Sequence, residues 1–362
     1  MTTIHGYAMT EPGKPLEAFE RPLPALGEGE ALVRVAGCGV CHTDVGFLHG
    51  GVRTKHPLPL VLGHEVSGVV EQAGPGADEL VGQAVVVPAV LPCGECAACK
   101  AGRGTICPRQ VMPGNDVHGG FASHLVVPAR DLCPVRGGDS GGTIGDSGVG
   151  LAELGVIADA VSTPWQAIKR AGLRKGELAV FVGAGGVGGF GALLARSIGA
   201  TVATLDVSAQ RIDAMRELGV DLAVNIDGME PKAVRGELRG FAKELGLAAT
   251  PWRIFETSGT APGQELAFSL LNHGAILSVV GFTPARVTVR LSNLMAFDAS
   301  AIGNWGCDPA LYPELVELAV AGSLPIAPMV SKRPMSEVNE VLDEMHHHKS
   351  DGRRAVLVPD FA

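Results

Sequence analysis

The sequence of 362 residues lacks any hydrophobic run that approaches the roughly 20 apolar residues of a membrane span. Residues 1–21 contain neither the hydrophobic core nor the cleavage pattern of a secretion signal. Internal repeats and low-complexity tracts are also absent from the sequence. A membrane protein is therefore not expected, and the cytoplasm is the expected location.

The chain also lacks an excess of positive charge, because 29 lysine and arginine residues stand against 38 aspartate and glutamate residues. The net charge of −9 disfavours binding to nucleic acid or to anionic membranes, so an anionic ligand must meet a local basic patch. Eight cysteines are present, but without an export signal their clustering indicates metal ligands and not disulfides. The length suffices for about two domains.

A glycine-rich turn organises the second half of the chain. Residues 179–182 are apolar and predict a buried parallel strand, and helical spacing follows from residue 187 onward. Glycines at such a turn allow a tight bend, close approach of a pyrophosphate and close packing of helix on strand. With the free N–H groups of the helix start, this turn is expected to bind a dinucleotide through Gly183, Gly185, Gly186, Val187 and Gly188.

An acid follows this turn at the distance that dinucleotide binding requires. The next apolar run ends in Asp206, at about the 20-residue offset of the carboxylate that binds a ribose 2′-hydroxyl. This acid favours NAD, because a 2′-phosphate would meet like charge. Strands expected at 221–226, 252–255, 275–280 and 287–291, with helices between them, complete a doubly wound parallel sheet. A glycine-rich turn that binds nothing is the alternative, and this context disfavours it.

The first half of the chain predicts strands separated by long loops. Apolar or alternating runs at 31–36, 65–71 and 83–87 are separated by turns rich in proline and glycine. The cysteines and histidines lie mostly in the loops. Because binding groups are often placed on loops that a scaffold supports, we expect the chemistry in this β-rich half.

Four cysteines at short spacings form the strongest metal signal. Thiolates in this pattern can close a tetrahedron around zinc, and a site with four protein ligands is structural, not catalytic. A disulfide or redox role is the alternative, which the expected compartment and the spacing oppose. The pattern predicts one structural zinc ion per chain, held in a lobe of residues 92–108 by Cys93, Cys96, Cys99 and Cys107.

A second metal site is indicated by Cys41 in a Gly-x-x-Cys-His-Thr-Asp segment and by His64 in Gly-His-Glu. A thiolate and an imidazole that the fold brings together supply two ligands of a catalytic zinc ion, which keeps one position open for substrate oxygen. Each residue alone has an ordinary alternative as a buried cysteine or a structural histidine.

With these motifs, the chain resembles the zinc-containing alcohol dehydrogenases of the medium-chain dehydrogenase/reductase superfamily over essentially its whole length. The matching segments also include Gly-Gly-Phe-Ala at 119–122 and Arg-Arg at 353–354. The resemblance implies an α/β protein with a GroES-like β-rich catalytic domain and a Rossmann domain with a doubly wound parallel sheet. The expected bounds are 1–160 for the catalytic domain, 161–307 for the NAD-binding domain, and 308–362 for a return to the catalytic domain.

The resemblance also implies roles for individual residues. Cys41 and His64 resemble ligands of the catalytic zinc, and Asp159, four residues before Thr163, falls at the position of the third ligand; Glu153 is a competing candidate that lies too early. Thr43 resembles the hydroxyl that takes the substrate proton, Glu65 the acid beside the metal, and Asp44 the partner of the ligand histidine. The resemblance implies cofactor contacts at His42, Thr163, Val280, Arg354 and, beside the adenosine ribose, Arg211.

Two departures from the family bear on proton transfer and substrate. The histidine that often ends the proton relay is replaced by Gly46, and His49 is a possible substitute. The loop 50–57 carries three basic side chains that would suit an anionic substrate, with an ordinary solvated loop as the alternative. Residues 346–348 are three histidines that we interpret as a helix end and not as a metal site.

The implied reaction is hydride transfer from a secondary alcohol to NAD at a catalytic zinc ion. Segments 114–121 and 302–306 resemble relatives that oxidise a cyclic hydroxyacyl-CoA in the anaerobic degradation of aromatic compounds. The alternatives are a general NAD-dependent alcohol dehydrogenase, an NADPH-dependent enone or enoyl-CoA reductase, and a zinc- and nucleotide-binding protein without activity. A homodimer or homotetramer is implied through the expected strand at 287–291.

Overall fold

The computed structural model describes residues 3–137, 143–349 and 352–361, and it divides into two compact units. Unit 1 comprises residues 1–162 and 306–362, and unit 2 comprises the continuous segment 163–305. No helix among the described residues is both long and apolar enough to cross a membrane.

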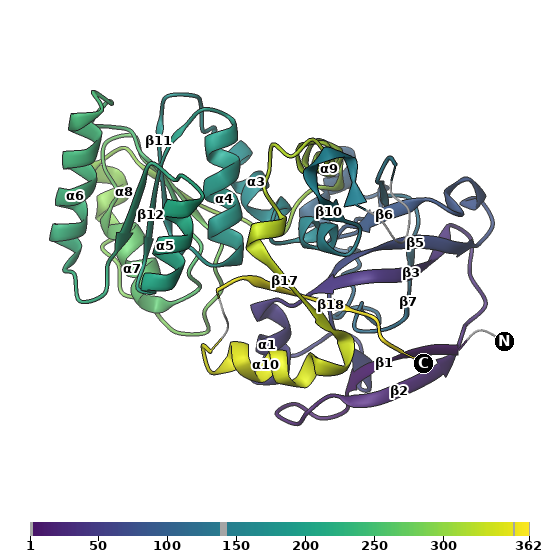
Figure 1. Ribbon diagram of the computed structural model, residues 1–362. Helices are drawn as coiled ribbons and strands as arrows, with labels where there is room; N and C mark the ends of the chain where they lie inside the picture. The colour runs from purple at the N-terminus through teal and green to yellow at the C-terminus, as the bar shows by residue number, and fades with distance from the viewer. Residues whose placement is uncertain (1–2, 138–142, 350–351, 362) are drawn as a thin grey trace. The chain divides into compact units, whose positions relative to one another are not determined.

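Unit 1 is built on a seven-stranded sheet in the order β17-β18-β3-β5-β6-β8, with β7 paired to β3 (Figure 1). Its strands are β3 (Glu30–Gly39), β5 (Glu65–Ala73), β6 (Ala84–Val87), β7 (His124–Pro128), β8 (Cys133–Pro134), β17 (Val330–Pro334) and β18 (Arg354–Val358). The last of these, β18, pairs antiparallel with β3, so the end of the chain completes a sheet begun near its start.

A smaller sheet and several helices complete unit 1. The sheet has the order β2-β1-β4, with β1 (Thr3–Met9), β2 (Glu17–Pro22) and β4 (Leu60–Val61), and β9 (Thr143–Ile144) pairs with β10 (Val149–Gly150). The α-helices are α1 (His42–Leu48), α2 (Ala97–Lys100), α9 (Tyr312–Val320) and α10 (Val338–His346). Apolar side chains of β3, β5, α1 and α10 share one core, which includes Leu32, Val66, Phe47 and Leu342.

Unit 2 is a six-stranded, wholly parallel sheet in the order β13-β12-β11-β14-β15-β16. Its strands are β11 (Leu178–Val182), β12 (Thr201–Asp206), β13 (Leu222–Asn225), β14 (Arg253–Glu256), β15 (Ile276–Val279) and β16 (Ser300–Gly303). Its helices are α3 (Ser162–Ala171), α4 (Gly186–Ser197), α5 (Ala209–Glu217), α6 (Pro231–Glu244), α7 (Ala261–Ser269) and α8 (Ser292–Ala296).

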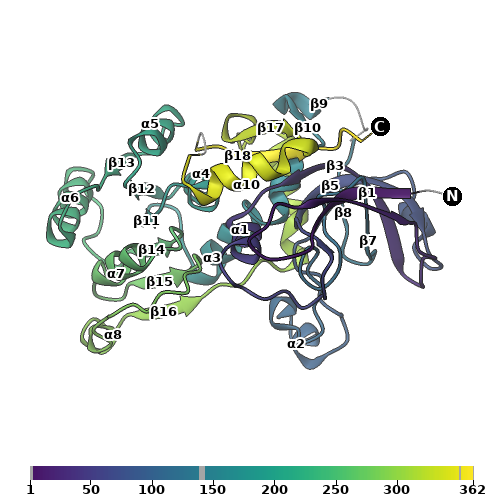
Figure 2. The same ribbon diagram turned by 90° about the horizontal axis from the view of Figure 1, so that it is seen from below.

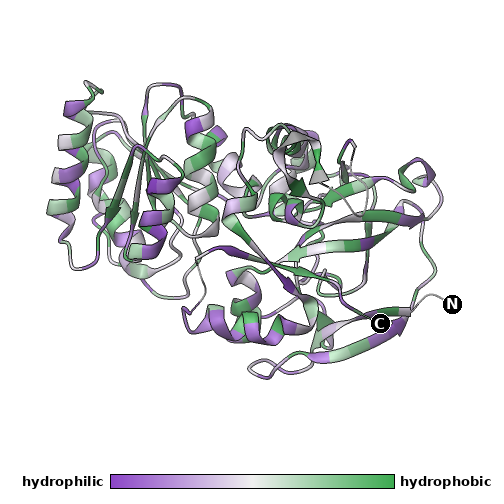
Figure 3. Cartoon of the chain, in the orientation of Figure 1, coloured by the Kyte–Doolittle hydropathy of each residue, from purple (hydrophilic) through white to green (hydrophobic). Residues whose placement is uncertain are grey.

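Helices cover both faces of this sheet, with α4 and α5 on one side and α6 and α7 on the other (Figure 2). Every residue of β11 is buried, as expected of a central parallel strand between two helical layers. The strands β11 and β12 are correspondingly hydrophobic, whereas α6 mixes hydrophobic and polar residues (Figure 3). This doubly wound sheet confirms the α/β prediction.

One predicted strand is wrong. Residues 287–291 form no strand, and the edge of the sheet is β16, which pairs with β15. The alternation of Val287, Val289 and Leu291 matches a strand pattern, but only Val289 packs against the core, while Leu291 is 69% exposed. Alternation without a hydrogen-bonded neighbour does not make a strand.

Candidate active site and metal centres

Four side chains from separate parts of unit 1 each bring one potential ligand atom to within 4.8 Å of the others: Cys41, His64, Glu65 and Asp159. Cys41 directly precedes α1, and His64 directly precedes β5. Asp159 follows a short 3-10 helix, Glu153–Ala158. The fold therefore brings together a thiol, an imidazole and carboxylates, although Cys41 and Asp159 are 118 positions apart in the sequence.

The spacing of these atoms fits a tetrahedral zinc ion. The Oδ2 atom of Asp159 lies 3.5 Å from the Sγ atom of Cys41 and 3.6 Å from the Nε2 atom of His64. Ligand atoms that lie about 2.0–2.3 Å from zinc at tetrahedral angles are roughly 3.4–3.6 Å apart. Sulfur, nitrogen and oxygen donors at these separations can hold one zinc ion together.

Asp44 holds the two ligand segments together. One oxygen accepts the N–H of Cys41 at 2.9 Å, and the other accepts the N–H of Gly63 at 3.0 Å. The same second oxygen lies 3.6 Å from the Nδ1 atom of His64, whose opposite ring nitrogen faces Asp159. This fully buried carboxylate therefore fixes both the backbone around the ligands and the orientation of the imidazole.

The electrostatics of the pocket favour a cation. Burial lowers the pKa of His64, but the carboxylates of Asp44 and Asp159 outweigh it, so the pKa lies well above its ordinary value. A buried site that draws its imidazole toward the cationic form carries an excess of negative charge. A divalent ion bound there would compensate that charge.

Glu65 is tied to Arg354 in a buried ion pair. The Nε atom of Arg354 donates to Oε2 of Glu65 at 3.0 Å, and a second guanidinium nitrogen donates to Oε1. Gly39 makes room for this acid, since a Cβ atom there would lie 2.1 Å from Oε2 of Glu65. Arg354, for which we predict a pyrophosphate contact, thus also balances the acid beside the metal ligands.

The competing ligand Glu153 lies in different surroundings. Its carboxylate accepts the N–H of Gly150 at 2.9 Å and pairs with Lys332 at 2.9 Å, and it does not belong to the metal-ligand cluster. Thr43, in contrast, places its hydroxyl 3.5 Å from the Sγ atom of Cys41. His49 stacks on His346, an arrangement that gives no sign of a relay role.

The four cysteines of the lobe form the second donor set. Their sulfur atoms are 3.5 Å apart for Cys96 and Cys99, 3.7 Å for Cys96 and Cys107, and 4.0 Å for Cys93 and Cys99. A zinc ion with four sulfur ligands at about 2.3 Å has sulfur atoms roughly 3.8 Å apart, whereas a disulfide requires about 2.05 Å. The sulfur spacing therefore fits zinc and rules out bonded pairs in this arrangement.

The thiols of this lobe differ in acidity. The backbone N–H of Glu95 lowers the pKa of Cys93 to about 6, while desolvation raises the pKa of Cys99 to about 11. Because zinc binds thiolates, its binding must displace the proton of Cys99 at neutral pH. Metal loading of this lobe is therefore coupled to proton release.

In unit 2, the glycine turn has the predicted form. Gly183 has φ of 100° and directly follows β11, and Gly185 is the N-cap of α4, whose first residues are Gly186, Val187 and Gly188. A Cβ atom at Gly188 would lie 1.8 Å from the carbonyl oxygen of Gly183, so only glycine permits this close packing. The helix start leaves its N–H groups free for a phosphate.

Asp206 ends β12 beside this turn. Its oxygens accept the N–H of Ala184 at 2.7 Å and the N–H of Ser208 at 2.9 Å, and Arg211 lies 3.6 Å away. The acid and the arginine thus lie next to the phosphate-binding turn. The other predicted cofactor contacts lie in both units. The backbone carbonyl of Thr163 accepts a hydrogen bond from the side-chain amide of Asn304, and Val280 directly follows β15. His42 is the first residue of α1 in unit 1.

Sequence reasoning missed two buried polar residues. The hydroxyl of Tyr312 donates to the carbonyl of Ala158 at 2.5 Å, so it supports the residue before Asp159. Glu256 accepts the N–H groups of Ser258 at 2.8 Å and Gly259 at 3.1 Å through one oxygen. Neither belongs to a spaced motif, and neither could be found without the fold.

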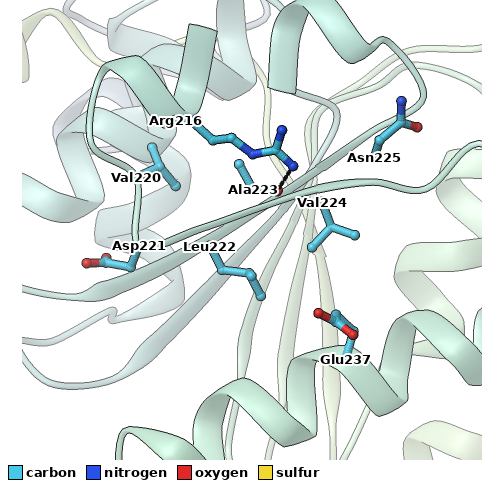
Figure 4. A pocket seen from close by; sticks show the side chains of 8 residues that line it. All are labelled: Arg216, Val220, Asp221, Leu222, Ala223, Val224, Asn225 and Glu237. Carbon is cyan, nitrogen blue, oxygen red and sulfur yellow. Dashed lines mark hydrogen bonds between the residues drawn. The ribbon is translucent and has the colours of Figure 1, made fainter. Parts of the chain in front are cut away.

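A hollow of about 520 Å³ lies elsewhere in unit 2, along the edge strand β13 (Figure 4). Arg216 spans it and donates to the carbonyl of Ala223 at 2.9 Å, with Asp221, Asn225 and Glu237 around it. None of the predicted cofactor or metal residues lines this hollow. We therefore do not assign the reaction to it.

A zinc donor set of the catalytic type, a closed four-cysteine lobe and a dinucleotide turn define a zinc-dependent oxidoreductase. Comparison with known proteins gives the same class: residues 27–137 match the alcohol dehydrogenase GroES-like domain, and residues 186–321 match the zinc-binding dehydrogenase model. An alcohol dehydrogenase of Geobacillus stearothermophilus is 31% identical over 343 residues, covering 94% of this chain and 95% of that protein. The chain belongs to the zinc-containing alcohol dehydrogenase family.

Two further similarities extend over almost the whole chain. An NAD-dependent alcohol dehydrogenase of Sulfurisphaera tokodaii is 26% identical, with 98% of this chain and all of that protein covered. A cobalt- and zinc-bound thermostable alcohol dehydrogenase from Pyrobaculum aerophilum superposes with a TM-score of 0.80 at 27% identity, covering 99% of this chain and 100% of that one. The chain is an oxidoreductase of this type, with zinc and NAD(P) as cofactors.

Proposed function

We propose that this protein is an NAD-dependent dehydrogenase of secondary alcohols, with Cys41, His64 and Asp159 as ligands of the catalytic zinc ion. The observation that carries the proposal is the convergence of these three donors at zinc-like separations in one buried site. The relatives described above are alcohol dehydrogenases, which supports a general alcohol substrate.

The residues of the chain have distinct tasks in this reaction. The zinc ion supplies Lewis acidity, which makes a nearby alcohol a stronger acid. Thr43, whose hydroxyl lies beside the Cys41 thiol, would accept the alcohol proton at Oγ1 and pass its own hydroxyl proton on to solvent. Asp44 keeps the His64 ring oriented, and Arg354 neutralises Glu65 so that this acid does not repel electron density at the reacting oxygen. The turn that contains Gly183, Gly185 and Gly188 would hold NAD, which when bound would supply the hydride acceptor for the carbinol carbon.

We further propose that the cofactor is NAD and not NADP. Asp206 ends the strand after the glycine turn and places its carboxylate beside the expected ribose position. A 2′-phosphate there would meet like charge, although Arg211 lies 3.6 Å from the same carboxylate. Replacing Asp206 with glycine should therefore lower the ratio of kcat/KM with NAD to kcat/KM with NADP, which steady-state kinetics with both cofactors would measure.

A second candidate substrate is 6-hydroxycyclohex-1-ene-1-carbonyl-CoA, oxidised to the 6-oxo compound. It rests on the resemblance of segments 114–121 and 302–306 and on the basic loop 50–57. In this loop Lys55 pairs with Asp116 at 2.9 Å, while Arg53 is exposed and forms no ion pair with the described residues. The third basic side chain, His56, has its Nδ1 atom 2.6 Å from the carbonyl oxygen of Pro57, so Arg53 is the basic group of this loop that remains for an anion. The relatives described above are alcohol dehydrogenases and not enzymes of CoA thioesters.

Metal analysis and a substrate panel test both proposals. Asp159→Ala should lose the catalytic zinc ion and NAD reduction while keeping the ion of the cysteine lobe, whereas Glu153→Gln should keep both ions. Zinc loss in Glu153→Gln but not in Asp159→Ala would reverse the ligand assignment. Equal kcat/KM for simple secondary alcohols, polyols and the cyclic hydroxyacyl-CoA would exclude the CoA substrate as the preferred one.

We also propose that the protein forms a homodimer or homotetramer. The strand β16 is an unpaired edge of the parallel sheet, and large apolar side chains lie exposed near it in unit 2, including Leu291 and Met295. A second copy could pair with that edge and cover this surface. Light scattering of Met295→Lys should show dissociation if this face is the interface.

A further inference from the structure

A further group of histidines lies where α1 ends beside the end of α10 (Figures 1 and 2). His49 is the C-cap of α1, His346 is the last residue of α10, and His347 is its C-cap. The rings of His49 and His346 stack with centroids 4.4 Å apart, and the ring of His347 is 5.0 Å from that of His346. Two helices far apart in the sequence thus present three imidazoles together.

These side chains are exposed and available to solutes. His49, His346 and His347 all belong to the exposed class, and the Nδ1 atom of His347 lies 3.2 Å from a carboxylate oxygen of Asp343. Imidazole nitrogen with an occasional carboxylate is the donor set that Ni²⁺, Cu²⁺ and Zn²⁺ prefer in proteins. Hard cations such as Mg²⁺ and Ca²⁺ prefer oxygen ligands only.

The local charge favours a cation over an anion. The end of α10 carries the partial negative charge of its free carbonyl groups, and Asp343 and Glu344 lie in its last turn, opposed by Lys349 just beyond it. Partial desolvation by adjacent groups and the nearby His346 lower the pKa of His49, which favours its neutral ring. A neutral imidazole is the form that binds a metal.

The sequence alone indicates a helix end and no metal site at residues 346–348, but the fold adds His49 from a second helix. We propose that His49, His346 and His347 form a surface site for one divalent transition-metal ion, with Asp343 as a further donor. Among the described residues these histidines are not one of the groups whose ligand atoms lie within 4.8 Å of one another, so their rings must turn to bind an ion. Exposed side chains change rotamer within nanoseconds, so the rings can turn their nitrogens toward one ion without movement of the helices. The bound ion would link α1 to α10.

This site is independent of the substrate and of the catalytic zinc ligands, but it lies on an element that matters for both. α1 begins directly after Cys41 and contains Thr43 and Asp44. An ion that joins the end of α1 to α10 would hold this helix in place. Transition-metal concentration would then affect the stability of unit 1.

Nickel binding to the full-length, untagged and zinc-loaded protein tests the proposal. Equilibrium dialysis with Ni²⁺, followed by metal analysis, should show one nickel ion in addition to two zinc ions per chain. The variants His49→Gln and His346→Gln should each weaken nickel binding at least about tenfold, the loss expected when one strong ligand is removed. His273→Gln, which alters an exposed histidine of unit 2, is the matched control and should bind as the parent does.

A second measurement separates ligand loss from misfolding. Added Ni²⁺ should raise the midpoint of thermal unfolding of the parent and of His273→Gln, but not of His49→Gln. The proposal is overturned if nickel only replaces zinc, if no nickel is retained, or if His49→Gln binds nickel as tightly as the parent. Equal weakening in His273→Gln would also overturn it, because binding would then be spread over surface histidines.

Discussion

At the scale of single residues, the catalytic site depends on carboxylates that differ in what they hold. Asp159 faces both the thiol of Cys41 and the ring of His64, whereas Asp44 binds the backbone N–H groups of the two ligand segments. Glu65 is neutralised by Arg354. The three acids of this site therefore have different partners: Asp159 faces the two proposed zinc ligands, Asp44 binds backbone N–H groups, and Glu65 is paired with an arginine.

Replacing Asp44 with asparagine tests its bracing role. One of the two N–H acceptors becomes an amide N–H group, so the His64 ring and the Cys41 backbone lose a fixed partner. We expect the affinity of the catalytic site for zinc to fall about 10–100-fold, as for other partners of metal ligands. Metal retention against graded chelator measures it, with Asp213→Asn as an exposed control; unchanged retention would remove Asp44 from this role.

His118 gives a prediction about pH. Burial, Arg21 and His56 lower its pKa to about 4, and its Nδ1 atom accepts the N–H of Val61 at 3.2 Å, which requires a neutral ring. A free histidine titrates near 6.5, so the unfolded chain binds this proton more readily. Stability associated with His118 is therefore lost as pH falls from about 6.5 toward 4.

An NMR titration of the histidine ring protons checks this value. The His118 resonance should stay in its neutral position down to about pH 5, and Arg21→Gln should shift its midpoint upward because one repelling charge is removed. A midpoint near 6.5 in the parent would contradict the environment described for this ring.

At the scale of elements, the sequence predicted the central parts of the parallel sheet well. Residues 179–182 and 201–206 are apolar runs, and they form β11 and β12 almost as expected, because buried parallel strands need continuous hydrophobic sequence. The edge strand β16, Ser-Ala-Ile-Gly, has no such signal, since its backbone pairing to β15 and not its composition makes it a strand. An edge strand of this kind is therefore recognised by the strand with which it pairs and not by its own sequence.

The residues of the metal sites also divide into those that the sequence indicates and those that only the fold reveals. Closely spaced donors such as the four cysteines are visible as a motif, and Cys41 and His64 were found through resemblance. Tyr312, whose hydroxyl supports the carbonyl before Asp159, comes from a helix 150 residues away and carries no local pattern. Long-range hydrogen bonds of single residues exist only once the chain is folded.

Two glycine-to-alanine substitutions test the start of α4 against an ordinary helix position. Gly188→Ala places a Cβ atom 1.8 Å from the carbonyl of Gly183, whereas a Cβ atom at Gly236 in α6 meets nothing within 4 Å. We expect the first to weaken NAD binding by about 5- to 100-fold, since overpacking costs about 1–3 kcal/mol and about 1.4 kcal/mol is tenfold. The second should raise the free energy of unfolding by up to about 1 kcal/mol.

Titration calorimetry with NAD and urea unfolding would measure these two effects. The Gly236→Ala protein should bind NAD as the parent does, which controls for a general effect of added methyl groups. Normal NAD affinity in Gly188→Ala would show that the turn tolerates a side chain and that the cofactor binds elsewhere.

At the scale of the whole molecule, the cysteine lobe is expected to stabilise unit 1 and not to take part in the reaction. Cys99→Ala removes one of four sulfur ligands, so the chain should retain one zinc ion in place of two. We expect lower thermal stability and faster proteolysis within residues 93–107. The fraction that keeps the catalytic zinc ion should turn over normally; two retained zinc ions with parental stability would refute the structural role.

The two units differ in how the chain builds them. Unit 2 is one continuous segment, whereas unit 1 needs both ends of the chain. The strand β18 lies between β17 and β3, so a strand at residues 354–358 fills an interior position of a sheet whose other strands include residues 30–39. Arg354, the partner of Glu65, arrives with it.

This threading sets an order of assembly on the ribosome. Unit 2 has all its strands once residue 305 has emerged, but the first-made strands of unit 1 must wait for the last ones before their sheet is complete. Until β18 has emerged, Glu65 would lack its counter-charge, and residues 38–39 of β3 would lack their partner strand. A nascent chain stalled before residue 354 should thus contain a folded unit 2 joined to a unit 1 whose sheet still lacks β18.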